Sequence, residues 1–80
     1  MPVTDYELIL ISALRYALGR RTYIVSITTH YIEKEIPTLS EQCKAVMIQD
    51  IEKARSYGDK IDKKEWMKLL EKLKGGGRDD

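Results

Sequence analysis

Apolar residues recur every three or four positions in four segments of the chain, which is the spacing of amphipathic helices. The first segment opens with the capping-box sequence Thr4-Asp5-Tyr6-Glu7, whose hydroxyl and carboxylate can satisfy the first free amides of a helix. Its apolar row is Leu8, Ile11, Leu14 (or Arg15) and Leu18, and the stripe is widened by Ile9, Leu10, Ala13 and Ala17. Gly19 then offers the left-handed conformation that ends helices, so we predict a helix over about residues 5–18.

The second segment, residues 22–36, contains many β-branched and aromatic residues, which strands favour. Its spacing nevertheless predicts a helix, because one row consists of Ile24, Ile27 (or Thr28), Tyr31 and Glu35, and beside it lie Val25, Ile32 and Ile36. Strict alternation would mix polar and apolar residues on one face. A single strand among three helices would also lack a pairing partner. The helix is expected to end just before Pro37.

The third segment has the strongest helical pattern. A second capping box, Thr38-Leu39-Ser40-Glu41, stands at its start, and Gly58 is the expected terminator. The apolar row is Leu39, Cys43, Val46, Met47, Asp50 (or Ile51), Ala54 and Tyr57. The predicted helix covers about residues 39–57.

The fourth segment begins with Asp62-Lys63-Lys64-Glu65, which resembles the two earlier capping sequences. Its apolar stripe is Trp66, Leu69, Leu70 and Leu73, with Trp66 as the expected core anchor. The glycines at 75–77 end the pattern, so we predict a helix over about residues 62–74. Residues 75–80 are expected to form a flexible, Gly-rich tail.

These segments predict an all-α fold, a compact single domain of four helices over residues 1–74. A chain of 80 residues has room for one core and none for a catalytic cleft between lobes. Its 14 Lys+Arg and 13 Asp+Glu leave a net charge of +1, which gives no long-range field for nucleic acid or membranes. The apolar run 8–14 is too short to span a bilayer. With one cysteine, which fits a reducing compartment, we expect a soluble, cytoplasmic protein.

The aromatic residues are 5 Tyr and 1 Trp with no Phe, so every ring carries a polar group, which suits protein interfaces. Three arginines near the junction of the first two helices form the only local concentration of one charge sign. The predicted partner-binding residues are Arg15, Tyr16, Arg20, Arg21 and Tyr23. Two structural alternatives stay open. The tyrosines can lie at the rim of a small core, and the arginines can complement the carbonyl end of the first helix or pair with Glu33 or Glu35.

The sequence predicts no catalytic residue, no metal site and no cofactor. His30 and Glu33 are one helical turn apart, but a zinc site needs three or four ligands and the chain has no second histidine. Cys43 lies on the apolar row of the third helix, where a buried structural thiol is expected. A lysine repeat is interleaved with acidic residues and therefore predicts a solvated face of mixed charge, at Lys60, Lys64, Lys68 and Lys72.

Three stretches of the chain carry a family resemblance. Residues 13–25 (ALRYALGRRTYIV), 46–52 (VMIQDIE) and 65–70 (EWMKLL) resemble short uncharacterised proteins of bacteriophages and prophages of Gram-positive bacteria. The resemblance implies a mobile-element setting, in which small proteins are frequently inhibitors of host defence, including anti-CRISPR proteins, or accessory regulators. It carries over no catalytic residue.

The leading hypothesis is a non-enzymatic protein-binding module, encoded by a phage, that inhibits a bacterial defence or host protein by occluding its surface. The expected partner is a larger bacterial protein or ribonucleoprotein, with no membrane. A second copy of the chain is another expected partner, because the wide apolar first helix needs cover. The alternative is a helix-turn-helix DNA-binding regulator, in which the third helix would offer Gln42, Lys44, Gln49 and Arg55 to a groove.

Overall fold

The computed structural model describes residues 3–18, 20, 23–56 and 63–75, and within them the chain is all-α. The elements, in chain order, are α1 (Asp5–Ala17), α2 (Tyr23–Glu35), the short 3-10 helix η1 (Ile36–Thr38), α3 (Glu41–Ser56) and α4 (Lys63–Leu73). Each predicted helix is therefore present, and each observed end lies within two residues of the predicted one.

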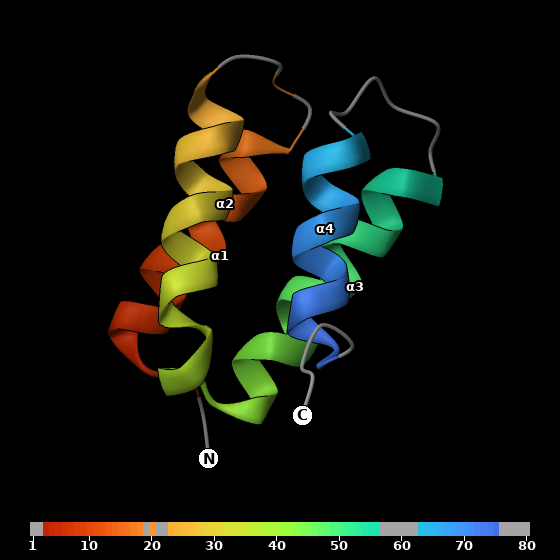
Figure 1. The fold of residues 1–80 in the computed structure, drawn as a ribbon. Helices are drawn as coiled ribbons and strands as arrows, with labels where there is room; N and C mark the ends of the chain where they lie inside the picture. The colour runs from red at the N-terminus through yellow and green to blue at the C-terminus, as the bar shows by residue number, and fades with distance from the viewer. Residues whose placement is uncertain (1–2, 19, 21–22, 57–62, 76–80) are drawn as a thin grey trace.

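The helices form two adjacent pairs (Figure 1). Helix α1 packs against α2 and α3, and α4 packs against the same two helices. In Figure 1 the α1–α2 pair lies beside the α3–α4 pair. All four helices contribute side chains to one hydrophobic core. Each helix consequently buries one sector against two neighbours and leaves its outer side to solvent.

The start of α1 follows the predicted capping box. The Thr4 hydroxyl accepts a hydrogen bond from the Glu7 amide, and the Glu7 carboxylate accepts one from the Thr4 amide, both at 3.1 Å. The helix ends at Ala17, because Leu18 turns out of the helical region with φ −59° and ψ 133°. Gly19, the predicted terminator, lies outside the described residues, as do Arg21, Tyr57, Gly58, Lys60, Asp62 and the tail residues 76–80.

The junction between α2 and α3 corrects the second predicted capping box. Thr38 does not cap α3, because it belongs to η1 and its hydroxyl donates to the Glu35 carbonyl at 2.8 Å. Ser40 caps α3 instead, and its Oγ accepts from the Cys43 amide at 3.1 Å. The 3-10 turn that includes Pro37 takes up the residues between the helices, so α3 begins at Glu41, two residues later than predicted.

The buried row of α1 differs from the predicted one at its start. Leu8 is 50% exposed, whereas the fully or nearly buried apolar side chains of this helix are Leu10, Ile11, Leu14 and Ala17. Arg15, the alternative to Leu14 in the predicted row, is exposed. The buried sector lies between the two contacts of α1, with α2 and with α3, and Leu8 stands outside it.

The core row of α2 is the second of the two rows seen in the sequence. Val25 and Ile32 are buried, whereas Ile27 and Tyr31 of the first row are 49% and 56% exposed. The polar Thr29 is buried with them, because its Oγ1 lies 3.2 Å from the Ser26 carbonyl oxygen and 3.5 Å from a Glu65 carboxylate oxygen of α4. Packing against α4, where Glu65 lies, thus decides between two rows that apolar spacing alone leaves equivalent.

The rows of α3 and α4 agree with the prediction. On α3 the buried side chains include Cys43, Met47, Ile51 and Ala54, and Ile51 rather than Asp50 fills its position in the core. On α4 all four predicted core residues are buried, and Trp66 is completely shielded from solvent. Gly75 follows this helix in the left-handed conformation, at φ 82°, which is the expected ending.

Candidate functional site

Large apolar side chains remain exposed on α1 and α2. Six of the seven exposed ones form two rows, which we call the α1–α2 outer face: Tyr6 (50% exposed), Ile9 (64%), Tyr16 (60%), Tyr23 (71%), Ile27 (49%) and Tyr31 (56%). Single exposed apolar residues are ordinary on a protein surface, but six on two neighbouring helices form a candidate interaction surface.

On α1 the exposed residues share one flank of the helix. At about 100° per residue, Tyr6, Ile9 and Tyr16 fall within roughly 80° of one another around the helix axis, away from the buried Leu14. Leu8 lies outside this flank. It is seven residues, or about two helical turns, before Arg15, so the two residues share one side of α1. That side faces α3, because Arg15 pairs with Asp50 of α3.

On α2 the exposed row is Tyr23, Ile27 and Tyr31, spaced four residues apart. Glu33, on the side of this helix toward α4, has its carboxylate 3.3 Å from the Lys72 ammonium of α4. At about 100° per residue, Ile27 and Tyr31 each lie about 160° from the buried Thr29 around the helix axis, so the exposed row points away from the core that α2 shares with α1 and α4.

The two exposed rows meet at the start of α1 and the end of α2. The pKa of the Tyr6 phenol is raised by desolvation, then by the charges of Glu35 and Tyr31, and by a hydrogen bond with Glu35. The hydrogen bond with Glu35 puts the start of α1 against the end of α2, where Tyr31 also stands. Tyr6 and Tyr31 thus connect the row on α1 to the row on α2.

A cation lies over a ring at each end of the α1–α2 outer face. The Arg20 guanidinium is 4.4 Å from the centre of the Tyr16 ring, and the Lys34 ammonium is 5.8 Å from the centre of the Tyr31 ring. Of the predicted partner-binding residues, Tyr16 and Arg20 are in contact, and Tyr23 is exposed on the same face. Arg21 lies outside the described residues.

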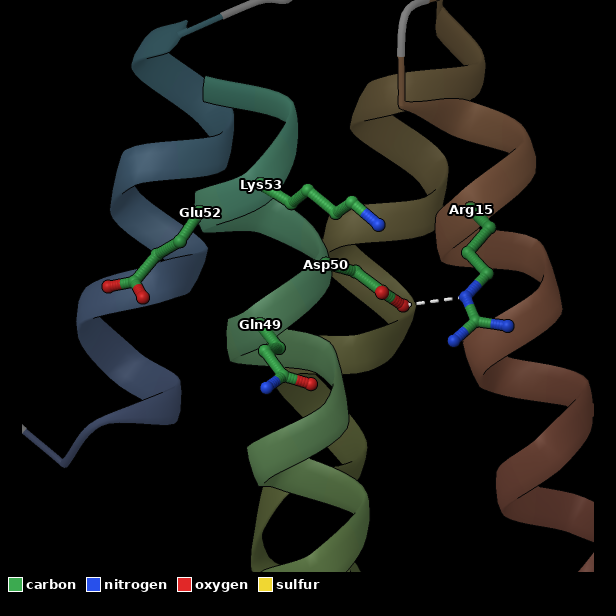
Figure 2. A pocket seen from close by; sticks show the side chains of 5 residues that line it. All are labelled: Arg15, Gln49, Asp50, Glu52 and Lys53. Atoms are coloured by element: carbon green, nitrogen blue, oxygen red, sulfur yellow. Dashed lines mark hydrogen bonds and ion pairs between the residues drawn. The ribbon is translucent and has the colours of Figure 1, made fainter. Parts of the chain in front are cut away.

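Arg15 is on another side of the molecule from this face. Its Nε lies 2.7 Å from Oδ2 of Asp50, so α1 and α3 are bridged across an open polar depression that Gln49, Glu52 and Lys53 also line (Figure 2). In Figure 2, Glu52 points away from Arg15 toward α4, and its carboxylate lies 2.8 Å from the Lys74 ammonium. The lining mixes both charge signs and includes paired groups, so the depression does not select a charged ligand.

A carboxylate is buried where α1 meets α3. Glu7 is 5% exposed and accepts hydrogen bonds from the Ser40 amide at 2.7 Å and the Ser40 hydroxyl at 3.1 Å, besides the bond from Thr4. Donation by the Ser40 amide, followed by that of the Thr4 amide, lowers the pKa of Glu7. With both oxygens engaged, this carboxylate joins two helix starts and has a structural role.

The two side chains considered for catalysis, Cys43 and His30, differ in their exposure to solvent. Cys43 is completely buried, as predicted, and burial followed by the charge of Glu7 raises the pKa of its thiol to about 11. His30 is exposed on α2. Among the described residues, no three His, Cys, Asp or Glu side chains converge on a metal-binding position.

The surface proposed for DNA reading in the alternative hypothesis is partly engaged within the protein. Lys44 forms an ion pair with Glu41 at 3.0 Å, and Gln49 stands beside the carboxylates of Asp50 and Glu52. Gln42 is exposed, and the Arg55 side chain lies outside the described part.

On α4, Lys64 and Lys68 are exposed, as expected for a solvated face. In the described part of the chain, no helix is both long and apolar enough to cross a membrane.

Four members of the outer face were not among the predicted partner-binding residues: Tyr6, Ile9, Ile27 and Tyr31. Their signals in the sequence are the width of the apolar surface on the first helix for Ile9, the row that contains Ile27 and Tyr31 on the second helix, and the set of polar-tipped rings that includes Tyr6. The width predicts contact with more than one neighbour, and the spacing of the second helix does not say which of its two rows is buried. Comparisons with protein-family models, curated proteins and solved structures find no match to this chain.

Proposed function

We propose that the chain is a non-enzymatic protein-binding module whose α1–α2 outer face docks on a larger bacterial protein or ribonucleoprotein. The observation that carries this proposal is the exposure of six large apolar side chains, between 49% and 71%, on two helices that pack against each other. Binding of a partner removes this apolar surface from water, which makes the free energy of association more favourable.

The chemistry of the face favours a protein as the partner. Tyrosine presents a large apolar area and a hydroxyl at low conformational cost, and arginine and tyrosine are both enriched at binding hot spots. Arg20 is held over the Tyr16 ring, so its guanidinium is positioned before binding and retains donors for a partner's carboxylates or carbonyls.

The proposed biological role comes from the resemblance to phage and prophage proteins. It is inhibition of a bacterial defence or host protein in the host cytoplasm, in the manner of an anti-CRISPR protein that covers a functional surface. A non-enzymatic mode is supported by the burial of Cys43 and the raised pKa of its thiol, which keep it protonated at neutral pH. Occlusion needs only a surface, and the outer face supplies one.

Affinity capture from a bacterial lysate tests this proposal. The immobilised wild-type chain is compared with Tyr16→Ser/Tyr23→Ser, which removes two exposed rings, and with Leu8→Ser as a matched control off the face. We expect a bound protein, identified by mass spectrometry, that the wild type and the control retain and the double variant loses. Equal retention by all three folded chains would reject the outer face as the docking surface.

A further inference from the structure

We propose that a second copy of this chain covers the α1–α2 outer face when no other protein does, in an antiparallel arrangement about a two-fold axis. This inference rests on the proposed function, because it assigns an occupant to the same docking surface. It also implies regulation, since self-association and binding of the larger partner exclude each other.

The first argument is area. With about 200 Å² for a large side chain, the six exposed side chains present on the order of 700 Å² to water at their observed exposures. One partner in a stable interface contributes about 800 Å². The summed exposed area of the face is thus close to what each half of a dimer contributes.

The second argument is shape. The face consists of two neighbouring helices of 13 residues each. Two copies placed face to face would therefore pack four helices in two layers, as in a four-helix bundle. The members of the face are three and seven residues apart on α1 and four residues apart on α2, and such rows can interdigitate with the equivalent rows of the other copy. A two-fold interface needs this kind of self-complementary surface.

The third argument is the distribution of charge. Arg20 stands at the end of the face where α1 finishes, and the opposite end carries Asp5 and Glu35 against one lysine, Lys34. An antiparallel arrangement places the basic end of each copy on the acidic end of the other. Because the net charge of the chain is only +1, two copies approach without strong repulsion.

Sedimentation of the full chain tests the inference, over concentrations from about 1 to about 200 µM. We expect the mass to rise from 9.3 kDa toward twice that value, with a midpoint in the micromolar range. Ile27→Glu should weaken self-association at least about tenfold, because a carboxylate would be buried in an apolar interface. Leu8→Glu introduces the same charge at a side chain of equal exposure off the face, and it should leave self-association unchanged.

Charge variants test the orientation. In the antiparallel dimer, Lys34→Glu makes the acidic end more acidic and strengthens association, whereas Arg20→Glu weakens it. Weaker association of Lys34→Glu together with stronger association of Arg20→Glu would overturn the antiparallel arrangement. A wild-type chain that stays at 9.3 kDa over the whole range, or a Leu8→Glu chain that dissociates as much as Ile27→Glu, would overturn the dimer itself.

The capture experiment separates this inference from the proposed function. A monomeric wild type whose lysate partner is lost only by variants of the outer face would reject the second copy and retain the docking surface. A dimer that Ile27→Glu disrupts, combined with capture that no variant of the face affects, would retain the second copy and reject the proposed function. Circular dichroism of each variant confirms that its helices are intact.

Discussion

Replacing Trp66 tests whether one residue holds α4 onto the rest of the domain. Its side chain is completely buried, and α4 packs against both α2 and α3. The indole Nε1 is buried with no hydrogen-bond partner among the described residues. Trp66 therefore contributes apolar burial to stability and carries an unfavourable polar group at the same time.

The expected size of the effect follows from these two terms. A fully buried tryptophan removes about 200 Å² from water, which at about 25 cal/mol per Å² stabilises the fold by about 5 kcal/mol. The unpaired N–H offsets about 1–3 kcal/mol of this. Trp66→Ala should thus lower the free energy of unfolding by about 3 kcal/mol, the lower end of the usual range for a large aromatic residue. Trp66→Phe removes the N–H while keeping a ring, so its loss should be near about 1 kcal/mol.

Urea unfolding followed by circular dichroism at the helix band measures both losses. Fluorescence is unsuitable, because Trp66 is the only tryptophan and both variants lack it. A domain of this size has a total stability of only about 4–12 kcal/mol, so Trp66→Ala can be partly unfolded without denaturant, and Trp66→Phe then provides the measurement. A loss below about 1 kcal/mol for Trp66→Ala would refute the anchor role.

Three further predictions concern individual groups. The pKa of Glu7 is lowered in the folded chain, so its carboxylate stabilises the fold above the ordinary carboxyl pKa of about 4.3 and this stabilisation is lost as the pH falls through and below that value. The melting temperature of the wild type should therefore fall more between about pH 6 and about pH 3 than that of Glu7→Gln, and equal falls would contradict the buried cap. Cys43 should react with a thiol reagent at least about 100-fold more slowly in the native chain than in urea, since its thiol is buried and its pKa is raised to about 11; a fast native reaction would show that it is accessible. Arg15→Ala should change the free energy of unfolding by less than about 1 kcal/mol, because the Arg15–Asp50 pair is solvent-exposed on the arginine side, and urea unfolding would reveal a larger contribution.

Much of the fold was predictable because local signals agree with one another. The capping box at Thr4 and Glu7, the apolar stripe of α4 and the left-handed Gly75 all depend on residues within one or two helical turns. Such signals survive packing, since the contacts that produce them are made inside a single element.

The errors arose where a residue distant in the sequence decides the outcome. Two rows of α2 are almost equally apolar, and the buried one is fixed by α4, where Glu65 lies close to Thr29. Thr38 and Ser40 both suit a helix start, and the carboxylate of Glu7, 33 residues earlier, bonds to Ser40. The residue spacing within one segment cannot predict these contacts, because the partners lie in other segments of the chain.

The candidate site shows the same division. Tyr16, Arg20 and Tyr23 were identifiable from residue type and their place at the helix junction. Ile27 and Tyr31 belong to one of two apolar rows whose spacing does not say which is buried, and only the packing of α2 shows that this row is exposed. Arg15 was grouped with the other arginines by proximity in sequence, but the turn of the helix directs it to Asp50.

The most direct test of the central claim is methyl NMR of the isoleucine side chains, recorded while the captured partner is added to a fixed concentration of the chain. Ile9 and Ile27 report on the α1–α2 outer face, and Ile48 and Ile51 report on α3. We predict shifts or broadening at Ile9 and Ile27, with the methyls of Ile48 and Ile51 unchanged. Changes confined to Ile48 and Ile51 would contradict the claim that the outer face is the binding surface.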